Sequence, residues 1–161
     1  MSRAQPGAEP GAEPVPAAGG EVFLTGGTGF VGGAVLRHLL GEGRRVRALC
    51  RTDEQAQRLR ELGAEPWRGD ILDLEGLTAL IRGAAVVYHL AGGNELCPKD
   101  PRALYRANVD GSGNVIVAAA RTGVRRVVHT SSSTTIGEPA GAMPRSAYHA
   151  RLRRIVSSIG V

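Results

Sequence analysis

The sequence predicts an α/β fold in which a parallel sheet carries helices on both faces, that is, a doubly wound sheet. Two observations support this prediction. Short apolar runs alternate with helix-like segments from Glu21 onward, and a glycine-rich turn joins the first apolar run to the first helix. Parallel strands need right-handed crossover connections, which place helices on both sides of the sheet. Ligands of such sheets bind at the carboxyl ends of the strands.

The glycine-rich turn lies between residues 22 and 32 and is the most informative stretch of the chain. Gly26, Gly29 and Gly32 are spaced as G-x-x-G-x-x-G. Gly26 permits a tight turn, Gly29 lets backbone N–H groups approach a diphosphate, and Gly32 lets the helix pack closely on the strand. The N-terminus of the following helix favours an anion. The alternative is a turn without a ligand, because the chain holds 23 glycines in 161 residues.

The other elements follow from apolar periodicity and from start and stop signals. Strands are expected at residues 21–25, 45–50, 64–68, 84–90 and 125–130. Helices are expected at residues 30–41, 54–62, 72–81 and 100–122, with Asp53 as the N-cap of the second. Residues 134–144 are predicted to be a loop, and residues 148–159 a final basic helix.

Composition limits the classes of protein and of partner. Residues 1–20 contain four prolines and a repeated Gly-Ala-Glu-Pro, which predicts a disordered tail before a single domain at residues 21–161. The net charge is +5. However, 19 of the 20 basic residues are arginines spread along the chain, and no nucleic-acid-binding motif accompanies them. We therefore expect no nucleic-acid partner.

The sequence also argues against a membrane protein and against a metal protein. No apolar run approaches the ~20 residues needed to cross a bilayer, and residues 1–20 lack the apolar core of a signal peptide. A cytoplasmic location is the expectation. Cys50 and Cys97 have no pairing or metal-ligand spacing, so we expect reduced thiols and no metal site.

Six segments resemble, in order and spacing, the NAD(P)-dependent epimerase/dehydratase and dihydroflavonol-reductase-like group of the extended short-chain dehydrogenase/reductase superfamily. They are FLTGGTGFVGGAVLRHLL at 23–40, VRALCR at 46–51, GDILD at 69–73, VVYHLAG at 86–92, NVDGSGNVIVAA at 108–119 and VRRVVHTSSSTTIGEP at 124–139. The resemblance covers about residues 21–139. It implies a Rossmann-type domain that binds a nicotinamide dinucleotide.

The resemblance assigns the pyrophosphate and the adenosine ribose to particular residues. The pyrophosphate loop would contain Gly26, Thr28, Gly29 and Gly32, with Phe30 and Val31 at its back. Arg51 stands where reductases of this family place a basic residue for the adenosine 2′-phosphate. NAD-preferring members have a carboxylate at this strand end, whereas here none occurs before Asp53. An arginine fork suits a phosphate, so NADP is expected, with NAD as the alternative.

The resemblance also assigns the adenine and the nicotinamide ribose. Asp70 would accept a hydrogen bond from the exocyclic amine of adenine, and Ile71 would pack on the ring. For Asp70 the alternative is an ordinary turn residue. Leu90, Ala91 and Gly92 would pass beside the nicotinamide ribose. The neighbouring His89 is interpreted as a structural residue at a strand end, and Asn108 either as a member of the site's hydrogen-bond network or as a plain helix residue.

Two residues are implied for catalysis. Ser132 matches the family's substrate-orienting serine, five residues before Gly137. Tyr148 is the candidate acid or base, although the family's Y-x-x-x-K is incomplete here. Leu152 occupies the fourth position after Tyr148, and Arg151 is one residue early. The alternative for Tyr148 is an ordinary tyrosine of an amphipathic helix.

Together these features predict an oxidoreductase or epimerase that acts on the carbonyl or carbinol of a small molecule, such as a sugar nucleotide. Family members continue well beyond the length of this chain, with a C-terminal substrate domain. The sequence therefore leaves open a truncated or frameshifted product, that is, a cofactor-binding module without turnover. A homodimer through the helix at 100–122 and the helix with Tyr148 is a further expectation.

Overall fold

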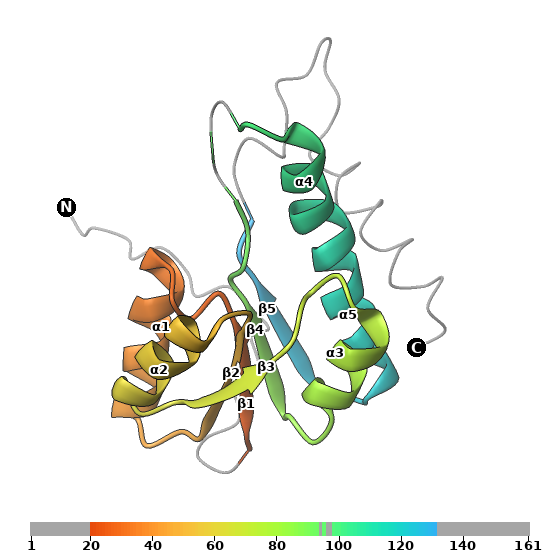
Figure 1. Ribbon diagram of the computed structural model, residues 1–161. Coiled ribbons are helices and arrows are strands. Elements are labelled where there is room, and N and C mark those ends of the chain that lie inside the picture. Colours follow the sequence, from red (N-terminus) through yellow and green to blue (C-terminus); the bar gives the residue numbers. More distant parts are fainter. Residues whose placement is uncertain (1–19, 94, 96–97, 132–161) are drawn as a thin grey trace, which may run out of the picture.

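The computed structural model describes residues 20–93, 95 and 98–131. Within these residues lies a five-stranded sheet in the order β3-β2-β1-β4-β5, and every neighbouring pair is parallel (Figure 1). The strands are β1 (Val22–Thr25), β2 (Val46–Cys50), β3 (Glu65–Arg68), β4 (Val86–His89) and β5 (Arg126–His129). The strand order reverses direction beside β1, which creates the crevice where such sheets bind ligands. The predicted doubly wound, Rossmann-type fold is confirmed.

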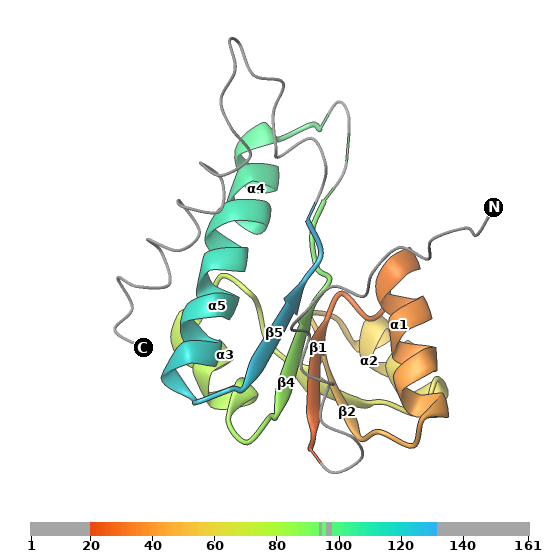
Figure 2. The ribbon, with the colours of Figure 1, turned by 180° about the vertical axis from the view of Figure 1, so that it is seen from behind.

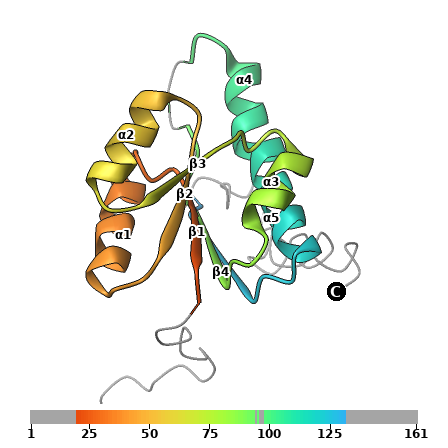
Figure 3. The same cartoon turned by 60° about the horizontal axis from the view of Figure 1, so that its bottom comes forward.

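Helices cover both faces of the sheet (Figures 1 and 3). Helices α1 (Phe30–Gly41) and α2 (Asp53–Glu61) lie on one face, and α3 (Leu74–Ile81) and α5 (Gly111–Arg121) on the other. The short helix α4 (Pro101–Tyr105) continues through a π-helical turn, η1 (Arg106–Asp110), into α5. Seen from behind in Figure 2, α4 extends beyond the carboxyl ends of β4 and β5. It therefore stands over the edge of the sheet where a ligand is expected.

The core consists of two apolar layers, one on each face of the sheet. The alternation of side chains along β1 sends Val22 and Leu24 to the layer under α1 and α2, and Phe23 to the layer under α3 and α5. All three side chains are fully buried. A strand that is apolar on both faces is typical of the centre of a parallel sheet. The core thus fixes the carboxyl ends of β1 and β4, which border the candidate site.

The structure corrects several predicted boundaries. The expected strands are one to three residues too long, and Thr52, not Asp53, caps α2 by accepting from the Gln55 N–H at 3.2 Å. The expected helix at 100–122 starts at Pro101 and is interrupted by η1. The loop predicted at 134–144 and the helix predicted at 148–159 lie outside the described residues, as does the tail apart from Gly20. Among the described residues, no helix is both long and apolar enough to cross a membrane.

Candidate functional site

The glycine turn brings β1, β4 and α1 into close contact. Gly26 has a φ of +76°, and a Cβ there would lie 2.6 Å from the backbone nitrogen of Ala91, which follows β4. A Cβ at Gly32 would lie 2.0 Å from the Gly26 carbonyl oxygen. A side chain at either position would force the backbone apart. Glycine is therefore needed at both positions because neighbouring backbone atoms occupy the space of a Cβ.

The N-terminus of α1 differs from those of α2, α3 and α4. The side chains of Thr52, Asp73 and Asp100 accept from first-turn N–H groups of α2, α3 and α4. The N-cap of α1 is Gly29, which has no side chain to offer, and the first turn carries no acidic residue. The first N–H groups of a helix have no acceptor within it, and the helix dipole adds positive potential there. This end of α1 is suited to an anion.

Two clefts adjoin the glycine turn and share Gly26, Gly29 and the segment Leu90–Gly93. The β2 cleft has a volume of about 390 Å³ and extends from Gly26 to the end of β2, where its lining residues include Leu49, Cys50, Arg51, Gln55 and Ile71. The β5 cleft has a volume of about 490 Å³, and its lining residues include Phe30, Val31, Asn108, Ser112, His129 and Ser131. Together the clefts run along the carboxyl ends of the strands, on both sides of the uncapped end of α1.

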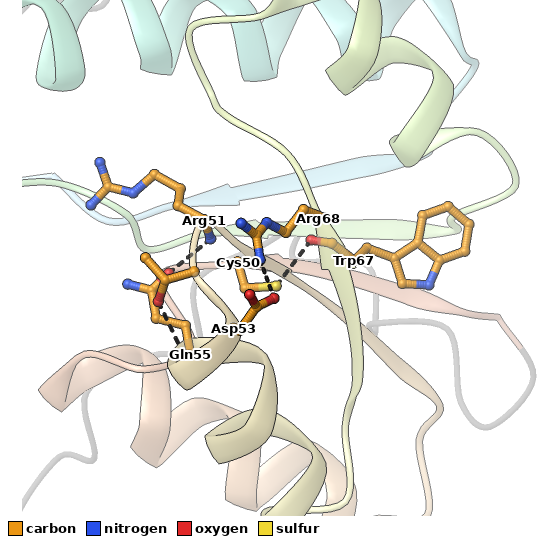
Figure 4. A network of polar contacts seen from close by, with 7 residues as sticks. Cys50, Arg51, Asp53, Gln55, Trp67 and Arg68 are labelled. Carbon is orange, nitrogen blue, oxygen red and sulfur yellow. Dashed lines mark hydrogen bonds and ion pairs between the residues drawn. The ribbon is translucent and has the colours of Figure 1, made fainter.

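Arg51 reaches the β2 cleft from the turn after β2 (Figure 4). Its backbone N–H donates to Gln55 Oε1 at 2.8 Å. The neighbouring carboxylate, Asp53, forms an ion pair with Arg68, and the Arg51 guanidinium extends away from that pair. The nearby acid is thus engaged with another arginine. The end of β2 presents an exposed cation to the cleft.

Two more arginines lie on the outer side of the same turn. Arg37 of α1 and Arg58 of α2 line a third cleft together with Gly27, Thr28 and Gly29. This cleft shares Thr28 and Gly29 with the β2 cleft. Positive side chains therefore lie on two sides of Thr28.

Cys50 also lines the β2 cleft, but it is a structural thiol. Its Sγ lies 3.5 Å from the Trp67 carbonyl oxygen, and burial raises the pKa of the thiol above its usual value. A raised pKa keeps the group protonated and weakly nucleophilic. Cys97 lies outside the described residues. In the described part of the chain, no group of three or more candidate ligands could hold a metal ion.

Asp70 and Ile71 occupy the turn after β3. Asp70 Oδ1 accepts from the Leu72 N–H at 3.0 Å, so this carboxylate also supports its own turn. Ile71 lines the β2 cleft, and its carbonyl accepts from Asn114 Nδ2 at 2.9 Å. Its side chain fills the space where a Cβ of Gly111 would lie. The position of Ile71 is therefore fixed by α5.

The segment Leu90–Gly93 is held at both ends by side chains. The Ala91 N–H donates to Thr25 Oγ1 at 3.2 Å. The Gly93 N–H donates to Asn108 Oδ1 at 2.8 Å, and Asn108 Nδ2 donates to the Gly93 carbonyl at 2.9 Å. Asn108 lies within η1, and π-helical turns are frequent at functional sites. Of the two interpretations of Asn108, the structure supports membership in the hydrogen-bond network around the clefts.

His89 ends β4 with a fully buried side chain. Its Nδ1 lies 2.7 Å from Thr25 Oγ1 and its Nε2 lies 2.9 Å from Ser112 Oγ, while its ring stacks on His129 at a centroid distance of 5.0 Å. Burial and, to a smaller extent, the neighbouring His129 together lower the pKa of His89 to about 4. The imidazole is therefore neutral at pH 7. The sequence indicated that His89 is a structural residue, but it gave no sign of the contacts with Thr25 and Ser112.

Phe30 and Val31 lie elsewhere than the resemblance implied, and the two residues implied for catalysis are not described by the structure. Phe30 and Val31 do not pack behind the turn: they are 96% and 50% exposed and line the β5 cleft. Both residues start α1, directly after its glycine N-cap. Ser132 and Tyr148 lie outside the described residues.

Comparison with known proteins identifies the family of the chain. Residues 22–153 match the NAD dependent epimerase/dehydratase family. A candidate dihydroflavonol 4-reductase of Synechocystis sp. is 42% identical over 115 residues, which are 71% of this chain and 33% of that protein. Human 3 beta-hydroxysteroid dehydrogenase type 7 is 36% identical over 122 residues, covering 71% of this chain and 33% of that enzyme. The chain spans about a third of the length of these curated relatives.

Solved structures show the same architecture. A short-chain dehydrogenase/reductase superfamily protein from Agrobacterium tumefaciens, solved with bound NAD, is 27% identical with a TM-score of 0.63, over 84% of this chain and 44% of that one. The UDP-glucose-4-epimerase of Stenotrophomonas maltophila is 23% identical with a TM-score of 0.67, over 89% of this chain and 50% of that one, and shares the fold. With the family match extending over most of its length, the chain belongs to the NAD-dependent epimerase/dehydratase family.

Proposed function

We propose that this chain binds NADP(H) along the two clefts and forms the nucleotide-binding part of an oxidoreductase or epimerase. The observation that carries the proposal is the uncapped, glycine-rich N-terminus of α1 between the clefts. A pyrophosphate suits this end because backbone N–H groups and the helix dipole both favour an anion. The adenosine would occupy the β2 cleft, and the nicotinamide the β5 cleft beside Leu90, Ala91 and Gly92.

The preference for NADP over NAD rests on charge at the end of β2. A 2′-phosphate needs cations, whereas a free 2′-hydroxyl group is bound by a carboxylate. Arg51 faces the β2 cleft, and Asp53, the next carboxylate along the chain, pairs with Arg68, while Glu95 is the acidic residue in the lining of that cleft. Arg37 and Arg58, on the other side of Thr28, add positive potential. The balance of charge favours a phosphate on the adenosine ribose.

The chemistry that the bound nicotinamide would supply is hydride exchange with a carbinol or carbonyl carbon of the substrate. The chain's own contribution is to bind and orient. Ser132 would donate a hydrogen bond to the substrate oxygen, and its neighbour Ser131 lines the β5 cleft. Tyr148 would supply or remove the proton at that oxygen. The curated relatives named above suggest a small ketone or alcohol, of the flavonoid or steroid kind, as the substrate class.

A second candidate is a cofactor-binding module without turnover. One observation favours it: Leu152 stands where the Y-x-x-x-K motif has its lysine. Both candidates require the same binding of NADP(H). They differ only in whether NADPH is consumed when a ketone is added.

Calorimetric titration of the chain with NADPH and with NADH tests the binding. We expect NADPH to bind with micromolar affinity and more tightly than NADH. Replacing Arg51 with aspartate (Arg51→Asp) should weaken NADPH binding about tenfold or more, because a charge-assisted hydrogen bond becomes a repulsion. Arg45→Asp is the matched control: it makes the same change of charge just before β2, at the opposite end of that strand.

Each outcome of the titration has a definite meaning. If the folded chain binds neither nucleotide, the proposed function is wrong. If both nucleotides bind equally and Arg51→Asp changes neither affinity, the cofactor site stands but the preference for NADP does not. A Gly29→Asp variant isolates the pyrophosphate site. A carboxylate there should cap α1 and repel the pyrophosphate, so NADPH and NADH should both be lost.

A further inference from the structure

We propose that His89 is a positioning residue for the cofactor site: through Thr25 it holds the segment Leu90–Gly93 where that segment borders both clefts. The inference rests on the proposed function and adds a residue to it. His89 itself does not line either cleft; its contacts are with Thr25, Ser112 and His129. Any effect on ligand binding must therefore pass through its neighbours.

The chain of contacts starts at Ser112 and ends at the backbone of Ala91. Ser112 Oγ lies against His89 Nε2, His89 Nδ1 lies against Thr25 Oγ1, and Thr25 Oγ1 accepts from the Ala91 N–H. These groups come from α5, β4, β1 and the segment after β4. In the parallel register, Thr25 is directly opposite His89, so the sheet itself brings the hydroxyl and the ring together.

Burial decides the direction of the hydrogen bonds. Thr25 is fully buried, and its hydroxyl proton needs an acceptor, because an unpaired buried donor is costly. His89 Nδ1, at 2.7 Å, is the acceptor that the structure offers. The proton of the neutral ring then lies on Nε2 and is donated to Ser112 Oγ. Ser112 lines the β5 cleft, so this series of hydrogen bonds begins at the place proposed for the nicotinamide.

The position of Ala91 matters because the segment and the glycine turn are in contact. The space of a Gly26 Cβ is filled by the Ala91 nitrogen and the Leu90 carbonyl group, at 2.6 to 2.7 Å. A shift of the segment would therefore disturb the turn that leads to α1. Asn108 holds the other end of the segment at Gly93. His89 and Asn108 thus fix the two ends independently.

A histidine that only stabilises the fold would produce a different pattern of binding. Loss of stability alone affects all ligands of the folded protein equally, whereas displacement of Leu90–Gly93 should weaken the nicotinamide half selectively. Adenosine 2′,5′-bisphosphate reports on the adenosine half, and NADP⁺ reports on both halves. The ratio of the two dissociation constants therefore separates a positioning role from a structural one.

Two substitutions divide the contacts of His89. The side-chain amide of asparagine reaches the position of Nδ1, and that of glutamine reaches the position of Nε2. His89→Gln should lose the Thr25 contact and weaken NADP⁺ binding about tenfold, with the affinity for adenosine 2′,5′-bisphosphate unchanged. His89→Asn should keep the Thr25 contact and retain most of the affinity for NADP⁺. Calorimetry on each folded variant gives both constants.

Thr25→Val and Thr25→Ser provide the same test without altering the histidine. Valine keeps the shape of threonine but removes the hydroxyl, so it should reproduce the selective loss, and serine should restore binding. Val115→Ala, on the buried side of α5, is the control: it should lower stability and leave both affinities unchanged.

Equal losses for the two ligands in His89→Gln, or no loss in either, would overturn the positioning role. If Thr25→Val binds NADP⁺ as tightly as the unaltered chain, the role is overturned as well. Failure of the unaltered chain to bind either ligand is a different result: it refutes the proposed function, and this inference with it.

Discussion

Two buried polar side chains, Arg47 and His89, lie in the same sheet and solve the problem of burial in opposite ways. Arg47 is 4% exposed and lies near the amino end of β2; His89 is fully buried at the carboxyl end of β4. The charged guanidinium of Arg47 is surrounded by partners. His89 is neutral, because burial and His129 disfavour its protonated form. The comparison separates a polar group that supports the fold from one that lies beside the candidate site.

The partners of Arg47 all belong to the scaffold. Its guanidinium donates to the carbonyls of Leu80 and Arg82, at the end of α3, both at 3.0 Å. Nε lies 3.0 Å from Glu21 Oε2, in an ion pair without the alignment of a hydrogen bond. The guanidinium carbon lies 4.5 Å from the ring centroid of Trp67. A cation at the carboxyl end of a helix also interacts favourably with the helix dipole.

The largest expected effect is on stability, at Arg47. Arg47→Met would leave the Glu21 carboxylate without its cation and two carbonyl groups without their donor, and should lower the free energy of unfolding by about 3 kcal/mol. Urea denaturation measures this loss. Arg47→Lys, which keeps the charge but not the planar fork, should lose less.

The comparison with His89 requires that folded Arg47→Met bind NADPH with unchanged affinity. A loss of NADPH affinity comparable to that of His89→Gln would break the distinction between the amino and carboxyl ends of the sheet.

The second effect is the pH dependence that His89 confers on stability. Its pKa is about 4 in the folded chain and about 6.5 when unfolded, so between these values the unfolded chain binds more protons. The stabilisation is complete above pH 6.5 and decreases by about 3 kcal/mol as the pH falls to 4. Urea denaturation across this range, compared with His89→Asn, isolates the effect. Parallel curves for the two proteins would contradict the assigned neutral state.

The third effect tests close packing at the carboxyl end of the sheet. Gly32→Ala should cost about 2 kcal/mol, because its Cβ would overlap the Gly26 carbonyl oxygen, and it should weaken NADPH binding. Gly113→Ala is the control: it lies inside α5, with no atom within 4 Å of its Cβ, and should raise stability by about 0.5 kcal/mol. Thermal unfolding of both variants decides whether the loss of stability comes from the contact with the Gly26 carbonyl oxygen or from the loss of a glycine as such.

The sequence predicts the local features of this molecule well. The order of strands and helices, and the close packing of Gly32 against Gly26, follow from periodicity and glycine spacing, because they depend on residues close in the chain. The N-cap of α2 was misassigned by one residue, since Thr52 and Asp53 are both good caps and only the backbone geometry distinguishes them.

The sequence could not predict the contacts that depend on strand register. Thr25 and His89 are 64 residues apart, and only the parallel pairing of β1 with β4 places them opposite one another. The π-helical turn that carries Asn108 has no sequence signal of its own. The exposure of Phe30 and Val31 depends on what packs against the start of α1, which is a tertiary property.

The smallest expected effect concerns helix starts, where α1 and α3 differ although both begin at the carboxyl end of the sheet. Asp73 caps α3 by accepting from the Gly76 N–H at 3.0 Å, so Asp73→Ala should lower stability by about 1 kcal/mol and leave NADPH affinity unchanged. Urea denaturation and calorimetry measure the two quantities. A helix that starts with a side-chain cap gains stability from it, and one that starts with glycine leaves its N–H groups to a ligand. If Asp73→Ala weakened NADPH binding as strongly as Gly29→Asp, this difference between α1 and α3 would have no bearing on the site.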